Sequence, residues 1–245
     1  MDRLNPKKLA GALLHRLRYQ QVRGVLWSAV EFAVSPVGQL GLESLCRKDL
    51  TGPLGSVEAK IPITIGPATA SDIDQIVDLA EGLWSGTDGI GPYTRLGVRP
   101  TILDRFDRGQ KCFVAKIGDQ IVHYNWIGFD HEETIAGTGR YLHLNADEAV
   151  CHDGMTTEEY RGQRIHLAVH NQMLIWLKEN GYRRAYTVVG ALDRPANITH
   201  HRLDWEFSGV MLYLITRTTK RAYVLRVRGT LDPFNNRLPV DDSNR

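Results

Sequence analysis

A strand, a turn and a helix between Glu148 and Asn180 contain the residue types best suited to chemistry. The turn opens the helix with Arg161-Gly162-Gln163-Arg164-Ile165-His166. The first turn of a helix has backbone N–H groups without intrahelical partners and a partial positive charge, so it can hold a phosphate or pyrophosphate. Gly162 permits a close backbone approach, and the two arginines add positive charge. The spacing matches neither GxGxxG nor GxxxxGK[ST], which disfavours a Rossmann or P-loop site.

The strand before this turn, residues 148–156, contains the candidates for proton transfer. Regular alternation places Glu148, Val150, His152, Gly154 and Thr156 on one face and turns Asp153 to the other face. On that shared face Glu148 and His152 are about 13 Å apart, at a rise of roughly 3.3 Å per residue. Either Glu148 or His152 could relay a proton through water, and the ordinary pKa of histidine, about 6.5, suits that task. The structural alternatives are a hydrogen-bonded His152 beneath a loop and a solvated strand end at Glu148.

Metal and disulfide chemistry are not predicted. His166 and His170 stand four residues apart on the helix, a spacing that a metal accepts, but no Glu follows His166 and no third ligand is indicated. The three cysteines, Cys46, Cys112 and Cys151, are widely spaced and form no CxxC pair. A reducing, cytoplasmic location is therefore expected.

The elements that must position these residues follow from hydrophobic periodicity and turn signals. Strands are expected at residues 61–65, 111–117, 120–129, 141–144, 148–156, 183–189, 210–216 and 222–228, and helices after Thr69 or Ser71 and at 100–108, 161–180 and 195–205. Most neighbouring strands can be joined as hairpins, and there is one β-α-β crossover. The fold class expected is therefore α+β, with a mixed, mostly antiparallel twisted sheet flanked by helices.

Several segments together resemble the GNAT superfamily of N-acetyltransferases. They are Pro67–Ile73, the Cys112–Trp126 hairpin, the Glu159–Ile165 turn, the Leu177–Tyr182 helix end, the Ala185–Val189 strand and the Asp193–Phe207 segment. The resemblance covers about residues 60–230, and the order of elements agrees throughout.

This resemblance implies an acyl-CoA site, with acetyl-CoA or another acyl-CoA as co-substrate. The pyrophosphate is expected on the turn that opens the long helix, and the acyl carbonyl at backbone N–H groups near the end of the preceding strand. That strand and the next part, so that the pantetheine arm enters between them. The residues implied in donor binding are Gly154, Met155, Thr156, Arg161, Gly162, Gln163, Arg164, Ile165, His166 and Asn197. For Asn197, capping of its own helix is the simpler interpretation.

The implied reaction is direct attack of a substrate amine on the thioester. The amine must lose a proton, the oxyanion must be stabilised and the leaving thiolate must gain a proton. In the family a Tyr of the short helix after the fifth strand often protonates the thiolate. The matching helix has no Tyr, and Thr199, His200 and His201 are the possible substitutes, of which His201 is preferred; solvent could also supply the proton.

Two residues depart from the family's phosphate turn. Arg164 and His166 stand where the family has small residues, so their side chains could crowd a pyrophosphate, although Arg164 could also bind it. The donor could instead be a carrier-protein thioester or an aminoacyl-tRNA. A catalytically degenerate member that binds a ligand or regulates a partner is a further alternative. The acceptor expected is a small-molecule amine.

Charge and composition divide the chain into parts. Three are predicted: a basic helical extension and linker at 1–58, the acyltransferase domain at 59–231 and a polar tail at 232–245. Residues 1–50 hold eight basic and four acidic side chains, and the net charge of +2 for all 245 residues is too small to argue for bulk nucleic-acid binding.

The first segment could serve contacts with partners. A helix over residues 6–34 could pack on the core or offer a basic amphipathic surface to a membrane, a carrier protein or tRNA, and a homodimer is also possible. The chain has 42% hydrophobic and 24% charged residues, which excludes a disordered or collagen-like chain. No membrane span or signal peptide is recognised.

Overall fold

The computed structural model describes residues 26–27, 29–84, 96–129, 132–135, 140–219 and 222–229. The strands are β1 Gly38–Asp49, β2 Thr64–Pro67, β3 Lys111–Ile117, β4 Gln120–Gly128, β5 Glu132–Ile135, β6 Arg140–Leu142, β7 Glu148–Thr156, β8 Arg184–Gly190, β9 Glu206–Thr216 and β10 Ala222–Gly229. The helices are η1 Ala70–Asp72, α2 Ile73–Trp84, α3 Val98–Asp107, η2 Glu158–Tyr160, α4 Ile165–Glu179 and α5 Arg194–Arg202.

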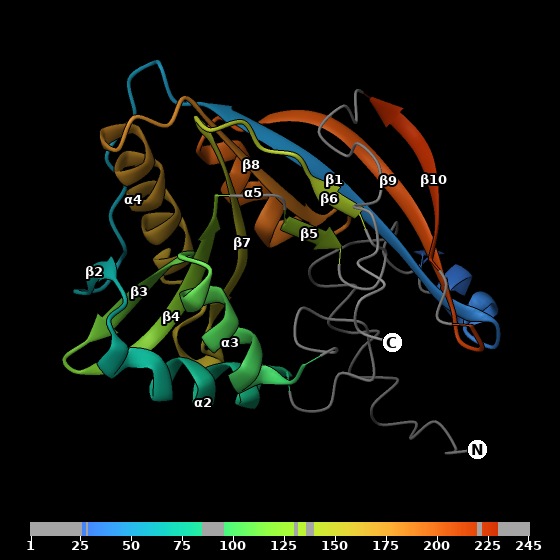
Figure 1. Ribbon diagram of the computed structural model, residues 1–245, viewed down its shortest axis with the longest axis horizontal. Helices are drawn as coiled ribbons and strands as arrows, with labels where there is room; N and C mark the ends of the chain where they lie inside the picture. Colours follow the sequence, from blue (N-terminus) through green and yellow to red (C-terminus); the bar gives the residue numbers. More distant parts are fainter. Residues whose placement is uncertain are drawn as a thin grey trace.

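One large mixed sheet organises the described chain. Its eight strands follow the order β10-β9-β1-β8-β7-β4-β3-β2, and β5 pairs with β6 separately. Within the sheet β7 and β8 are parallel, whereas the other neighbouring strands are antiparallel. Figure 1 shows β1, β9 and β10 extending together as a long curved arm. The predicted α+β class with a mostly antiparallel sheet is confirmed.

The two faces of the sheet are covered by different helices. Phe113 and Ala115 of β3 pack with α4, whereas Cys112 and Val114 pack with α2 and α3 on the opposite face. This alternation follows from the two-residue period of a strand, and it explains why β3 and β4 are buried on both faces. Figure 1 shows α2 and α3 side by side next to β4, apart from α4.

The N-terminal region corrects the predicted division of the chain. Residues 38–49 were expected within a linker, yet they form β1, which lies between β8 and β9 and pairs with both. Leu45 of β1 is 2% exposed and Leu50, just after it, is 1% exposed. The irregular segment is therefore confined to residues 50–63, and the strand before it is part of the core. The Gly and Ser residues in 38–44 interrupt the apolar–polar alternation typical of a strand, so this segment resembles a linker until its pairing with β8 and β9 is known.

Other local predictions agree with the structure. The β3–β4 hairpin turns at Gly118, which has a φ of +58°, and α4 is followed by Gly181 with a φ of +86°. The backbone N–H and hydroxyl of Thr69 both donate to the Asp72 carboxylate, which fixes the entry to α2. Residues 26–27 and 29–34 are helical, while residues 6–25 and 232–245 lie outside the described residues.

Candidate functional site

The parallel strands β7 and β8 pair over only part of their lengths. Their register runs from Glu148↔Arg184 to Cys151↔Thr187, although β7 continues to Thr156 and β8 to Gly190. Beyond the last pair, β7 remains joined to β4, and β8 remains joined to β1. In the described chain no strand pairs with the two edges that face each other there. We call this part of the sheet the open end, and the part around Glu148 and Arg184 the paired end.

A bulge in β7 changes which residues face each side at the open end. Tyr124 of β4 pairs with Met155 and Trp126 pairs with His152, so the register shifts between them, and Asp153 has a φ of +50°. His152 faces α3, whereas Gly154 beyond the bulge faces α4. The expected shared face of Glu148, His152, Gly154 and Thr156 is therefore wrong beyond His152. The Asp-Gly dipeptide at 153–154 was a sequence signal for this interruption.

Asp153 also differs from its expected orientation. Instead of pointing away from the His152 face, its carboxylate accepts a 2.5 Å hydrogen bond from Arg105 Nη1 of α3. The two side chains are 4% and 6% exposed, so this is a buried ion pair. The Arg105 guanidinium also lies 5.1 Å from the ring centre of Trp126. The ion pair thereby ties α3 to the bulge.

His152 is hydrogen-bonded next to this ion pair. Its Nε2 lies 3.2 Å from Oε1 of Gln110, in the turn between α3 and β3. Burial and the positive charges of Arg105 and Arg108 hold the pKa of His152 well below its usual value. The imidazole is therefore neutral at physiological pH, and it is the first residue of β7 after the last pair with β8.

The turn before α4 contains the predicted Arg161 and Gly162, but the helix begins at Ile165 and not at residue 161 as predicted. Arg164 precedes the helix with a φ of +61°, and Gly162 has a φ of +80°. Arg161 and Arg164 are exposed, and Arg161 Nε donates to the Thr156 carbonyl at 3.3 Å. The Gln163 carbonyl accepts from the Lys60 N–H, and Ile165 is buried in the core. Two exposed arginines thus lie beside the helix start, where positive charge favours an anion, and they follow the exposed Glu158 and Glu159 of η2.

His166 does not extend from this turn into solvent. Its ring packs against His123 at 5.3 Å and His170 at 5.5 Å between ring centres. A Cβ placed on Gly154 would come within 3.0 Å of His166 Cε1 and 2.8 Å of Asn125 Nδ2. Glycine at 154 therefore fits the close approach of the Asn125 side chain from β4 and the His166 side chain from α4.

The histidines continue as a buried cluster, which we call the histidine cluster: His123, His166, His170 and His200, with Trp205. The ring centres of His170 and His200 are 5.2 Å apart, and Trp205 lies within 5.5 Å of both. Burial lowers the pKa of all four imidazoles, and that of His166 falls to about 4. These residues were not predicted as a cluster because three separate elements bring them together.

Hydrogen bonds define the protonation of two of these rings. His200 Nδ1 donates to the Ala196 carbonyl at 2.7 Å, so in the neutral ring Nε2 has no proton. Asn125 uses its oxygen to accept from the Trp126 N–H, and its Nδ2 faces His170 Nδ1 at 3.4 Å. His170 therefore carries its proton on Nε2. A neutral His200 cannot protonate a thiolate.

The short helix α5 holds the remaining predicted residues. Asn197 donates to the carbonyls of Gly190 and Asp193, so it ties the start of α5 to the end of β8. Asp193 caps the helix by accepting from the Ala196 N–H. His201 is exposed on this helix. The observed contacts of Asn197 are those of a structural residue.

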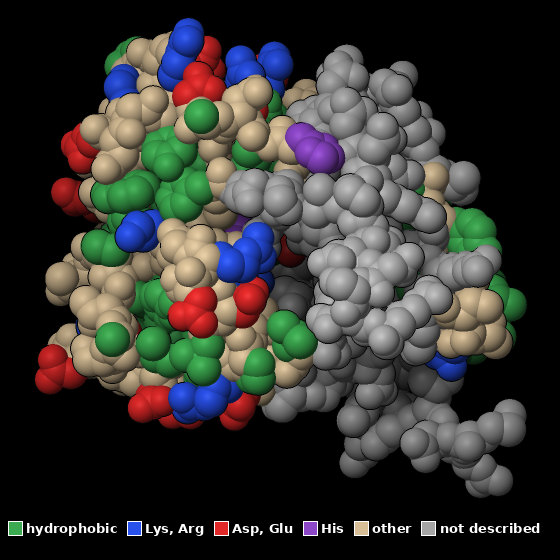
Figure 2. Space-filling model, viewed as in Figure 1, with side chains coloured by type: hydrophobic (Ala, Val, Ile, Leu, Met, Phe, Trp, Pro, Cys, Tyr) green, Lys and Arg blue, Asp and Glu red, His purple; other side chains and the backbone are tan. Residues whose placement is uncertain are grey.

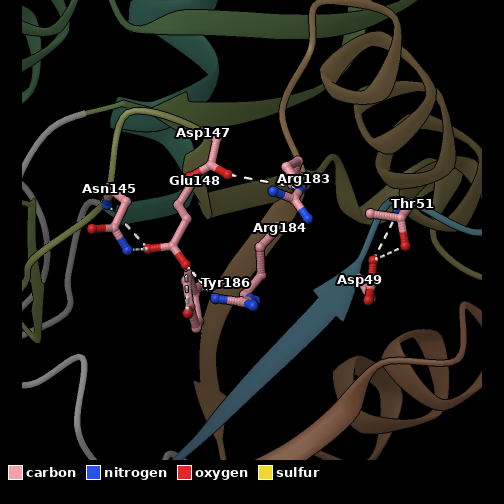
Figure 3. A network of polar contacts seen from close by, with 8 residues as sticks. All are labelled: Asp49, Thr51, Asn145, Asp147, Glu148, Arg183, Arg184 and Tyr186. Atoms are coloured by element: carbon pink, nitrogen blue, oxygen red, sulfur yellow. Dashed lines mark hydrogen bonds and ion pairs between the residues drawn. The ribbon is translucent and has the colours of Figure 1, made fainter.

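Glu148 lies at the paired end, away from the open end. Its carboxylate accepts from Arg184 Nη1 at 2.6 Å, from the Tyr186 hydroxyl and from the backbone and side-chain amides of Asn145 (Figure 3). Burial alone raises the pKa of Glu148, but these donors together hold it below its usual value. Asp147 and Arg183 border a polar cavity of about 210 Å³ here. We assign Glu148 a structural contact and do not retain it as a base.

A second carboxyl group near the open end was missed. Glu43 of β1 pairs with Gly190 at the end of β8 and shares the face of Leu45 and Met211. Burial and the nearby Asp193 raise the pKa of Glu43 to about 7. No sequence signal indicated Glu43, because the Gly and Ser residues of β1 resemble a linker.

The described residues include neither a metal-binding cluster nor a membrane-spanning helix. They contain no group of three or more His, Cys, Asp or Glu side chains arranged to hold a metal ion. Within the same ranges, none of the helices combines the length and apolar composition that crossing a bilayer takes. On the face in Figure 2, basic and acidic side chains are interspersed over the described part.

No protein-family model matches the chain, and no curated protein matches it in sequence. A Novosphingobium aromaticivorans chain assigned to the GNAT acetyltransferases is 14% identical, covering 73% of this chain and 65% of its own, with a TM-score of 0.48. A GNAT-family acetyltransferase from Streptococcus pneumoniae is 13% identical, covering 63% and 100%, with a TM-score of 0.46. AAC(6')-Iy, solved with the bisubstrate analogue CoA-S-monomethyl-acetylneamine, is 11% identical, covering 60% of this chain and 92% of its own, with a TM-score of 0.45. This chain therefore spans less than two thirds of the first of these structures.

Proposed function

We propose that the protein is a GNAT-type N-acyltransferase, which transfers an acyl group from acyl-CoA to the primary amine of a small molecule. The observation that carries this proposal is the open end, where β7 and β8 part after Cys151 and Thr187. Two strand edges that face each other without pairing offer backbone N–H and C=O groups to an extended ligand. A pantetheine arm contains amides that can pair with such edges.

The surroundings of the open end fit a donor with a diphosphate. The start of α4 follows β7 after a short turn, with Arg161 and Arg164 exposed beside it. Gly154, although within the sheet, is itself exposed. Met155 and Thr156 are partly buried next to it, and their backbone N–H groups are the proposed contacts of the acyl carbonyl. The donor thus extends from the helix start into the strand gap.

The proposed reaction uses few side chains. The amine attacks the thioester carbonyl carbon, its proton passes to the neutral His152, and the C–S bond breaks as the amide forms. The thiolate takes a proton from solvent or from the exposed His201, because neutral His200 has none on its unbonded nitrogen. One amide and one thiol result. The acceptor would approach from the α3 side, which His152 faces.

The test is thiol release by the purified full chain, measured with acetyl-CoA and longer acyl-CoA donors against a panel of amines. Amide formation in step with thiol release would support the proposal. Stabilisation by CoA in a thermal melt without turnover would instead favour a degenerate, ligand-binding member. Turnover only with a carrier-protein thioester or an aminoacyl-tRNA would overturn the donor but not the reaction type.

The position of the diphosphate has its own test. Arg161→Ala should weaken CoA binding and reduce its salt dependence, because a phosphate contact is lost. Arg183→Ala is a matched control, since this arginine is 72% exposed at the paired end. Equal CoA affinity in the two variants would contradict the placement at the start of α4.

The role of the N-terminal segment also remains a proposal. A contact of residues 6–34 with a membrane, a carrier protein or tRNA, and a homodimer, are each compatible with its basic composition. Deleting residues 1–58 would remove β1 from the sheet, so the informative deletion is 1–25. Unchanged retention on liposomes or tRNA after this deletion would exclude residues 1–25 as the contact with those two partners.

A further inference from the structure

The contact between His152 and Gln110 links the proposed proton acceptor to the turn after α3. Gln110 is 5% exposed and lies in the turn between α3 and β3, and its Oε1 is 3.2 Å from His152 Nε2. An amide oxygen can only accept a hydrogen bond, so Nε2 must carry the imidazole proton. In the neutral ring Nδ1 then has a lone pair. Among the residues that the structure describes, none forms a hydrogen bond with that nitrogen.

The charged groups around His152 keep the ring in this neutral form. Arg105 and Arg108 lie on α3, and Asp153 follows His152 on β7. The Asp153 carboxylate binds Arg105 instead of the imidazole. Trp126 of β4, which pairs with His152, stacks beneath the same guanidinium. The imidazole is therefore oriented by a neutral amide, and the net influence of its neighbours opposes a second proton.

We propose that Gln110 is a positioning residue that fixes His152 in the Nε2–H form and leaves Nδ1 to take the proton from the attacking amine. This inference rests on the proposed acyl transfer. The amine nitrogen forms its bond to the carbonyl carbon and gives one proton to Nδ1, while the C–S electron pair leaves with sulfur. A neutral partner does not stabilise imidazolium, so His152 passes the proton on to solvent after each turnover.

The first test does not depend on activity. Long-range ¹H–¹⁵N NMR of the ¹⁵N-histidine-labelled full chain separates the two neutral imidazole forms, with His152→Asn used to assign the signals. We expect the wild-type His152 to show a protonated Nε2 and an unprotonated Nδ1. A protonated Nδ1 would overturn the inference even if acyl transfer is found. Absence of acyl transfer with the expected NMR pattern would overturn the proposed function alone.

The second test uses substitutions of Gln110. Gln110→Leu removes the acceptor, so the imidazole proton of His152 should be distributed between Nδ1 and Nε2. As a result kcat should fall, with little change in KM for the donor. Gln110→Glu retains an acceptor and the Nε2–H form, but its charge should move the pH midpoint of kcat upward by about one unit. Both results would support the inference.

A matched control is Gln75→Leu. Gln75 also bridges two segments, through the Ile121 N–H and the Asp119 carbonyl, and neither of these hydrogen bonds involves a histidine. It should leave the pH profile of kcat unchanged. If Gln110→Leu and Gln110→Glu change neither the imidazole form nor the pH midpoint, Gln110 does not position His152.

Discussion

Polar side chains are buried at both ends of β7, but their hydrogen-bonding groups are satisfied to different extents. At the paired end, the Glu148 carboxylate is 4% exposed and is satisfied by four donors from Asn145, Arg184 and Tyr186. At the open end, the polar side chains are mostly neutral imidazoles, and Nε2 of His123, His170 and His200 has no partner within the described residues. Fully paired charges give a rigid structural end. Neutral groups with unused hydrogen-bonding atoms give an end suited to receiving a ligand.

Each end also has an ion pair, and these pairs differ in burial. Arg105 and Asp153 at the open end are 6% and 4% exposed, whereas Arg184 at the paired end is 44% exposed. A charge that loses its partner in the interior has no solvent to replace it. Substitutions that remove one partner should therefore cost more at the open end, although its remaining polar groups are less well paired.

The largest expected effect comes from Arg105→Met. It leaves the buried Asp153 carboxylate without its guanidinium, in a residue whose backbone has a φ of +50°. We expect a loss of about 3–4 kcal/mol in the free energy of unfolding, measured by urea denaturation. Arg99→Met on the same helix is the control, because its ion pair with Asp74 is exposed and should contribute little. Similar losses in the two variants would contradict the comparison.

A smaller loss is expected from Gly154→Ala. The added Cβ would come within 2.8 Å of Asn125 Nδ2, and Asn125 is itself held through Trp126 and His170. We expect about 2 kcal/mol of destabilisation from overpacking, with weaker CoA binding. Gly66→Ala in β2 is the matched control, since nothing lies within 4 Å of its Cβ. A Gly154→Ala variant as stable as the control would show that the open end is looser than its contacts indicate.

Much of the fold could be predicted because local signals define most elements. The hairpin at Gly118, the helix through Glu179 and the strand at 184–190 follow from periodicity and turn residues. The position of β1 could not be predicted, because a strand inserted between β8 and β9 depends on pairing with residues about 140 to 180 positions away. Its Gly and Ser residues resemble a linker until both neighbours are known.

The candidate site was predictable in its backbone and less so in its side chains. Gly162 and the arginines near it predict a turn after the strand, although the helix begins at Ile165, four residues later than expected. The parting of the two strands is implied only by the resemblance. The bulge at Asp153 reversed the face of Gly154. The contact of Gln110 with His152 joins residues 42 positions apart, and no local pattern indicates such a contact.

At the paired end, Glu148→Gln should cost about 1–2 kcal/mol in the free energy of unfolding. The amide retains the shape of the side chain but loses the negative charge to which Arg184 and Tyr186 donate. Arg184 is exposed enough for water to replace part of the lost contact. Acyl transfer by the folded variant should remain unchanged. Thermal melts and acyl-transfer kinetics are measured on this variant and on the control Glu206→Gln, which removes one partner of an exposed ion pair. Loss of kcat without loss of stability would return Glu148 to the catalytic residues.

The pH dependence of stability separates the two ends most finely. The pKa values of His152 and the histidine cluster are lowered by burial, so the unfolded chain binds protons below about pH 6.5 that the folded chain does not. Stability contributed by these histidines is therefore present above pH 6.5 and is lost as the pH falls toward 4. Each fully neutral imidazole contributes about 1.4 kcal/mol per pH unit to this slope.

Glu43 acts in the opposite direction within the same pH range. Its folded pKa of about 7 lies above the ordinary 4.5, so between these values the folded chain holds a proton that the unfolded chain has lost. Its contribution is complete below pH 4.5 and disappears as the pH rises through 7. Glu43→Gln should therefore steepen the loss of stability from pH 6 to pH 5 by up to about 1.4 kcal/mol. Glu148→Gln should leave that slope nearly unchanged. The pKa of Glu148 is lowered in the folded chain, so this carboxyl group titrates below the range from pH 5 to pH 6. Urea unfolding at pH 5 and pH 6 measures both changes. Equal changes in stability for Glu43→Gln and the wild type would show that burial does not raise the pKa of Glu43.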